Sequence, residues 1–172
     1  MTIRRFGFTV DDPGYLFTVS MADEYEEQKE NVRGFLEEIC RRECGFSASV
    51  ICSDRWKKVY LIIYRVREAR NWKEYFQKNV VTGLCKNFPG TIICVWIETK
   101  QLTKLVDAMI QAGSLMEWNL LQPRGVLICQ QTVEKFEAVP VRYPVELEQR
   151  MREMIFDENK KEIARQFQLV CE

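Results

Sequence analysis

The chain has 172 residues, of which 47% are apolar and 29% charged, a balance typical of a packed globular protein. Its 25 basic and 25 acidic residues cancel, so the composition gives no global reason to expect binding to nucleic acid or to an anionic membrane. The chain has no histidine, which excludes Ser-His-Asp triads, Cys-His nucleophiles and histidine-ligated zinc.

The distribution of apolar residues and cysteines indicates a reducing compartment. The sequence has no apolar run long enough to cross a bilayer, and residues 11–13 interrupt the N-terminal segment before it could form a signal peptide. The seven cysteines are odd in number, and most lie in apolar runs such as 50–52 and 92–95. We therefore expect reduced cysteines and an intracellular protein, in the cytoplasm or nucleus, without a membrane segment.

The first half of the chain predicts alternating strands and helices. Residues 3–10 and 15–21 are rich in β-forming residues and flank an Asp-Asp-Pro-Gly turn, which predicts a hairpin. Residues 23–44 have apolar positions at helical spacing and predict a helix. Two strands are predicted at 47–53 and 58–66, and the second is expected to be interior because it lacks polar alternation.

The second half predicts further elements of both kinds. Asn71 is expected to cap a helix that ends before Pro89, and residues 91–97 predict another apolar strand. A short helix is expected at 100–112, ending at Gly113. We then expect a hairpin of strands 114–121 and 126–133 and a long C-terminal helix at 145–171.

These elements predict a single compact α+β domain over residues 1–172, with a mixed sheet and helices packed on it. The expected order is ββαββαβαββα. Residues 15–97 spell βαββαβ, the order of a ferredoxin-like unit. Residues 15–88 and 92–168 also each spell βαββα, which leaves a pair of pseudo-repeats as a second interpretation.

Candidate interaction residues come from large apolar side chains. Along the predicted strand 114–121, Met116, Trp118 and Leu120 alternate with other residues and share one face. Tryptophan and methionine are enriched at protein interfaces, which also makes Trp56 a candidate. The alternative is that the strand turns this apolar face into the core, as strands with one apolar face normally do.

A basic stretch with interleaved aromatic residues lies between residues 55 and 73. Cations beside aromatic rings are the elements with which proteins hold phosphates and stack bases. The stretch lacks the motifs of known RNA-binding sheets, and an interior strand would split its cations between two faces. The candidate nucleic-acid contacts are Arg55, Lys57, Lys58, Arg67, Arg70 and Lys73.

Glu98 and Lys100 follow the predicted strand 91–97 with the acid-x-lysine spacing found in metal-dependent nucleases. Such a site needs a second carboxylate, for which Asp54 is the candidate. The predicted helix between Asp54 and Glu98 gives the wrong element order for that fold. Glutamate and lysine also commonly flank a strand end as solvated residues, which is the alternative interpretation of Glu98 and Lys100. Glycine-rich phosphate loops and paired cysteine knuckles are absent from the sequence, so we expect no cofactor and no metal.

The function expected from these patterns is a non-catalytic protein-interaction module, an adaptor or subunit of an intracellular complex that binds another protein. The alternative is a nucleic-acid-binding domain that uses residues 55–73. A third interpretation is a metal-dependent hydrolase or nuclease built on Glu98 and Lys100. The sequence leaves open the identity of the partner and homo-oligomerisation.

Overall fold

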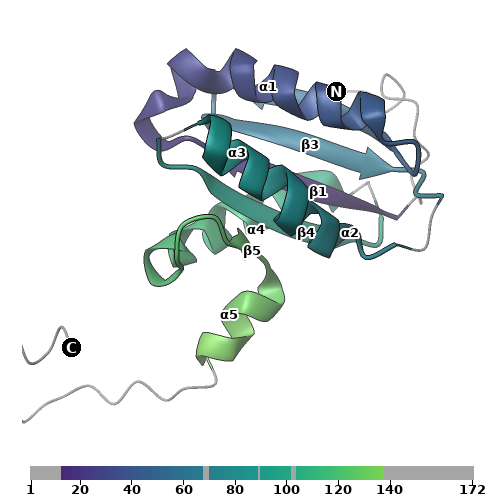
Figure 1. The fold of residues 1–172 in the computed structure, drawn as a ribbon. Coiled ribbons are helices and arrows are strands. Elements are labelled where there is room, and N and C mark those ends of the chain that lie inside the picture. Colours follow the sequence, from purple (N-terminus) through teal and green to yellow (C-terminus); the bar gives the residue numbers. More distant parts are fainter. Residues whose placement is uncertain (1–12, 68–69, 89, 102–103, 138–172) are drawn as a thin grey trace, which may run out of the picture. The chain divides into compact units, whose positions relative to one another are not determined.

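The computed structural model describes residues 13–67, 70–88, 90–101 and 104–137, and it confirms the predicted α+β class (Figure 1). The strands are β1 (Gly14–Ser20), β2 (Ser47–Ser53), β3 (Lys58–Tyr64), β4 (Ile93–Thr99) and β5 (Leu127–Ile128). The α-helices are α1 (Tyr25–Arg42), α2 (Trp72–Tyr75), α3 (Thr82–Asn87), α4 (Leu105–Met116) and α5 (Gln130–Glu137). Short 3-10 segments, η2 (Ala22–Glu24) and η5 (Glu117–Leu121), and a π-helical segment, η3 (Phe76–Val81), complete the described elements.

The five strands form one sheet in the order β2-β3-β1-β4-β5, with β4 and β5 parallel and the other neighbours antiparallel. From β1 to β4 this is the arrangement of a ferredoxin-like βαββαβ unit, as one interpretation of the sequence expected. Both edges of β1 are occupied, one by β3 and the other by β4. The hairpin strand predicted at residues 3–10 lies outside the described residues.

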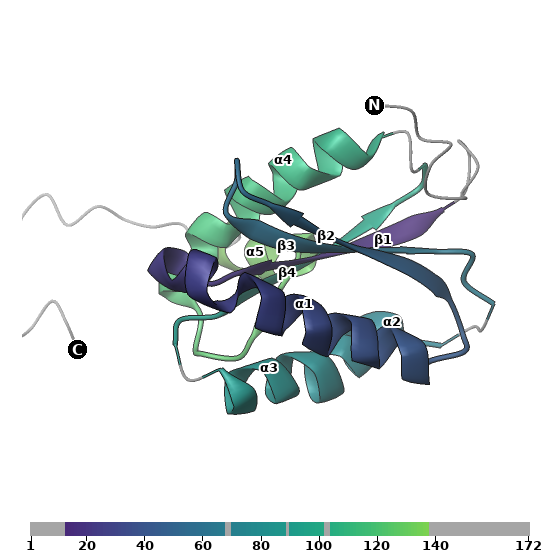
Figure 2. The ribbon, with the colours of Figure 1, turned by 90° about the horizontal axis from the view of Figure 1, so that it is seen from above.

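The sheet separates two apolar layers, because α1, α2 and α3 lie on one face and α4 lies on the other (Figure 2). β3 contributes to both layers: Val59, Leu61 and Ile63 face α1–α3, while Tyr60 and Ile62 face α4. Covering on both faces explains why this strand has no polar alternation, as predicted.

The run from α2 through η3 to α3 forms the second helix expected from the sequence. Asn71 caps it as predicted, since its side chain accepts a hydrogen bond from the backbone N–H of Glu74 at 3.1 Å. The π-helical segment carries Gln77, whose side-chain amide donates to the carbonyl of Gly125 at 2.8 Å and accepts from the N–H of Leu127 at 2.6 Å. Gln77 thus attaches the short strand β5 to the helical layer.

The predicted hairpin of residues 114–121 and 126–133 is wrong. Residues 114–116 continue α4 and residues 117–121 form η5, while only Leu127–Ile128 is a strand and α5 begins at Gln130. The helix continues through Gly113, where the sequence predicted its end. Ala108, Ala112 and Leu115 bury one face of α4 against the sheet, and this burial outweighs the cost of about 1 kcal/mol for a glycine inside a helix. Residues 92–137 therefore do not repeat the βαββα order, and the predicted helix 145–171 lies outside the described residues.

Replacing Thr18 with valine should stabilise the protein. Thr18 lies on β1, is fully buried, and its hydroxyl has no hydrogen-bond partner among the described residues. Removing an unsatisfied buried hydroxyl with little change of shape should raise the free energy of unfolding by about 1 kcal/mol. Urea denaturation measures this change. The control is Thr99→Val, which should lower stability because the Thr99 hydroxyl donates to the carbonyl of Gln101 at 2.7 Å. Destabilisation by Thr18→Val would contradict the prediction.

Replacing Gln77 with methionine should destabilise the protein by about 1–3 kcal/mol, because the carbonyl of Gly125 and the N–H of Leu127 would lose their partner. The comparison variant is Gln28→Met on α1, where the side chain accepts a hydrogen bond from Asn31 at the surface and a change within about 0.5 kcal/mol is expected. Equal denaturation midpoints for the two variants would show that Gln77 does not hold β5 in place.

Candidate functional site

The predicted interaction residues near α4 separate into core and surface. Met116 is buried in the layer beneath α4, and Trp118 is half-buried and packs against the same layer. Leu120, in η5, is 92% exposed. The three side chains therefore do not share one strand face, because the backbone that carries them is helical.

Trp56 lies apart from these residues in the turn between β2 and β3. Its side chain is 38% exposed, and its ring packs edge-on against Tyr60, with 6.0 Å between the ring centroids. Trp56 is thus partly available at the surface, but the same ring also covers the core residue Tyr60.

The outer face of α4 carries two further apolar residues, Val106 and Ile110, which are 58% and 60% exposed. They are four residues apart and so lie on the same face of the helix, away from the buried Ala108 and Ala112. They were not among the predicted interface residues, although apolar residues at 105–106 and 109–110 leave this helix without a continuous polar face. With Leu120, the segment 105–121 holds three of the four large exposed apolar side chains of the described residues.

The structure divides the basic stretch 55–73 between the two ends of β3. Arg55, Lys57 and Lys58 lie at its beginning, while Arg67, Arg70 and Lys73 follow its end. A strand of seven residues separates the two groups by roughly 20 Å. The first group is divided again, since Lys57 contacts Glu26 of α1, whereas the Nζ of Lys58 lies beside Gly113 of α4 on the opposite face.

Two cations of the second group, Arg70 and Lys73, are engaged with neighbouring side chains. The guanidinium of Arg70 lies 3.3 Å from the carboxylate of Glu43, and it stacks 4.0 Å from the ring centre of Tyr75. Lys73 donates to the side-chain carbonyl of Gln131. The sequence placed these cations in one stretch, but the fold does not combine them with the first group into a continuous basic surface.

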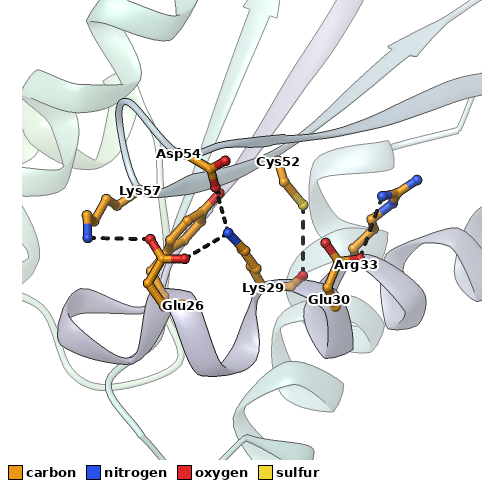
Figure 3. A network of polar contacts seen from close by, with 8 residues as sticks. Glu26, Lys29, Glu30, Arg33, Cys52, Asp54 and Lys57 are labelled. Carbon is orange, nitrogen blue, oxygen red and sulfur yellow. Dashed lines mark hydrogen bonds and ion pairs between the residues drawn. The ribbon is translucent and has the colours of Figure 1, made fainter.

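A polar network fastens the β2–β3 turn to the start of α1, as Figure 3 shows. The ammonium of Lys29 lies 2.7 Å from Asp54 and 2.8 Å from Glu26, and Glu26 also lies 3.5 Å from Lys57. The hydrogen bond from Lys29 lowers the pKa of Asp54, so this contribution to stability is present at neutral pH and is lost as the pH falls through the lowered pKa. Burial, followed by the nearby Asp54, raises the pKa of Tyr25 to about 12.

The acidic residues of the nuclease interpretation are not brought together. Glu98 pairs with Tyr15 near the start of β1, whereas Asp54 lies beyond the other end, where Ser20 pairs with Lys58. The two carboxylates are thus roughly 15 Å or more apart along the strands, too far to share a metal ion. Glu98 and Lys100 do line one cleft of about 650 Å³ together with Arg65.

Two further observations concern the described residues alone. They contain no group of three or more histidine, cysteine, aspartate and glutamate side chains that could hold a metal ion. None of their helices combines the length and apolarity needed to cross a membrane.

The cysteines of the described residues are free thiols with different degrees of burial. Cys94 and Cys129 are buried, Cys40 is half-buried, and Cys44 is exposed beyond the end of α1. Cys171 lies outside the described residues. Burial raises the pKa of the Cys40 thiol to about 12 and also raises the pKa of Cys94.

Comparisons of the chain with protein-family models, with curated proteins and with solved structures found no match. The candidate site therefore rests on geometry. The described surface offers one apolar segment, 105–121, and a set of cations dispersed over both ends of the sheet.

Cys44 should react with iodoacetamide in the native protein much faster than Cys40 or Cys94. The thiolate is the reactive form, and burial raises the pKa of Cys40 to about 12 and disfavours the Cys94 thiolate in the same direction. Mass spectrometry of peptides alkylated at pH 8, before and after denaturation, measures each site. Native labelling of Cys40 or Cys94 at the rate of Cys44 would show that these thiols are not enclosed.

Proposed function

We propose that the protein is a non-catalytic interaction module, an adaptor or subunit of an intracellular complex, and that it binds a partner protein through segment 105–121. The observation that carries this proposal is the exposure of Val106, Ile110 and Leu120 on one helix and the 3-10 segment that follows it. Single exposed apolar residues are common, but two on one helix face with a third nearby in sequence are a feature of interaction sites.

The surroundings of this surface suit a protein partner. Burying a valine, isoleucine or leucine side chain contributes about 1.5–3 kcal/mol, so these three side chains supply the core of a modest interface. Exposed polar residues within the segment, Asp107, Gln111 and Glu117, and Lys104 just before it can form the polar rim that such interfaces have. We infer that the partner presents a complementary apolar patch.

Nucleic-acid binding through residues 55–73 has less support. Phosphates need cations that follow a backbone, and here Lys57 and Lys58 face opposite sides of the sheet while Arg70 contacts Glu43. The described basic residues of this stretch therefore form no continuous track for a phosphate backbone.

The proposal predicts that Val106→Ser, Ile110→Ser and Leu120→Ser together abolish capture of the partner from a nuclease-treated cell lysate. The matched control changes three exposed residues of α3 on the other face of the sheet, Thr82→Ser, Lys86→Ser and Asn87→Ser, and should keep the partner. Mass spectrometry identifies the captured protein. The surface variant should unfold within about 1 kcal/mol of the wild type, since these side chains are solvated in the free protein.

Four results would contradict the proposal. The first is partner capture that survives the surface variant, and the second is a large loss of stability in that variant, which would mean that the side chains are buried in the free chain. The third is a homodimer that the surface variant dissociates, which would assign the surface to self-association. The fourth is sub-micromolar, salt-sensitive oligonucleotide binding that reversal of Arg55, Lys57, Lys58 and Arg70 to glutamate abolishes.

A further inference from the structure

The outer edge of β4 is only partly covered. On one side β4 pairs with β1 from Ile93 to Thr99, but on the other side β5 pairs only with Cys94 and Val95. The chain then leaves the sheet at Cys129 and begins α5 at Gln130. Among the described residues, Trp96, Ile97 and Glu98 therefore have no strand partner on this side. We call this part of the edge, Trp96–Glu98, the β4 notch.

A cavity of about 260 Å³ lies along the β4 notch. Its walls come from both helical layers, with Lys73 of α2 on one side and Gln111 and Leu115 of α4 on the other. Gln130 and Gln131, in the first turn of α5, also line it. The notch is thus an open sheet edge at the bottom of a walled cavity, unlike a flat exposed edge.

The two walls correspond to the two side-chain directions of β4. Trp96 belongs to the apolar layer beneath α1–α3, the layer that carries α2 and Lys73. Ile97 belongs to the opposite layer together with Leu115. A residue placed beside Trp96 in a neighbouring strand would direct its side chain toward Lys73, and the next residue would direct its side chain toward Leu115.

The Trp96 side chain leaves a hydrogen bond unmade. The residue is only 2% exposed and lines the cavity, yet its indole N–H has no acceptor among the described residues. A buried donor without an acceptor is uncommon and calls for a ligand or a water molecule. Lys73 adds a positive charge to the same wall, and its ammonium is held there by the side chain of Gln131.

We propose that the β4 notch binds an extended peptide segment of a partner protein, which adds to the sheet as a short strand beside Trp96–Glu98. The peptide carries an acidic side chain opposite Trp96, which pairs with Lys73, and an adjacent apolar side chain opposite Ile97, which packs on Leu115. This site is separate from the outer face of α4 and goes beyond the proposed function.

The test titrates the full-length, ¹⁵N-labelled protein with a blocked octapeptide centred on Thr-Glu-Leu-Thr. The Trp96 indole resonance, assigned with Trp96→Phe, should shift to saturation because Trp96 lines the cavity. Hydrogen exchange of at least one backbone amide among Trp96, Ile97 and Glu98 should slow about tenfold or more as the peptide covers the edge. A peptide with glutamine in place of glutamate should bind about tenfold more weakly, the effect of losing one charge-assisted hydrogen bond.

Variants of the protein distinguish peptide binding in the β4 notch from nonspecific attraction of the acidic peptide to lysine side chains. Lys73→Gln should weaken the peptide about tenfold. Lys78→Gln removes another lysine of the same helical run, one that pairs with Glu74, and should leave binding unchanged. A peptide methylated on its central backbone nitrogens should not bind, because it cannot donate the hydrogen bonds of an added strand.

The proposal is overturned if millimolar peptide leaves the Trp96 indole resonance unmoved. It is also overturned if Lys73→Gln and Lys78→Gln weaken binding equally, or if the methylated peptide binds like the parent. Loss of peptide binding in the surface variant Val106→Ser, Ile110→Ser, Leu120→Ser would show that the peptide occupies the outer face of α4 instead. The partner capture described above remains a separate readout, so either proposal can fail without the other.

Discussion

The two-sided pairing of β1 is the constraint on which the rest of the fold depends. β3 and β4 occupy its two edges, and Phe17 and Leu16 point into opposite apolar layers. Once β1 is central, the helical connections β1–α1–β2 and β3–α2–α3–β4 both cross the same face of the sheet, because such crossovers are right-handed. The opposite face of the sheet is then left for a later element, and α4 covers it.

Both proposed binding surfaces follow from how the chain completes the sheet after β4. One face of α4 is enough to cover the second apolar layer, so the apolar residues on its outer face, Val106 and Ile110, remain in solvent. β5 returns to the sheet for only two residues before α5 begins, which leaves the β4 notch uncovered by described residues. Gln77 fixes this geometry, since its two hydrogen bonds hold the chain where it enters β5.

On the described surface, charged side chains mainly form ion pairs that connect neighbouring elements or run along one helix. Lys29 connects α1 to the β2–β3 turn, Arg70 contacts Glu43 across the following loop, and further pairs run along α1. Exposed pairs of this kind contribute little stability individually. Within residues 55–73 such pairs engage Lys57 and Arg70, whereas Lys73 lines a cavity that it shares with Trp96, which makes Lys73 the cation best suited to a ligand.

The sequence alone determined the elements whose spacing of apolar residues can be read within the element itself. The uninterrupted apolar runs of β3 and β4, the helical stripe of α1 and the cap at Asn71 follow from periodicity and side-chain chemistry, and so does the ferredoxin-like order of β1–β4. Of the proposed interaction surface, only Leu120 was predicted. Residues 114–121 fit both a strand period and a helical period, and burial of Leu115 and Met116 against the sheet decided for the helix. Only the tertiary structure could bring Lys73 and Trp96 to the same cavity, because that cavity opens where β5 ends, and strand length is set by packing and not by local sequence.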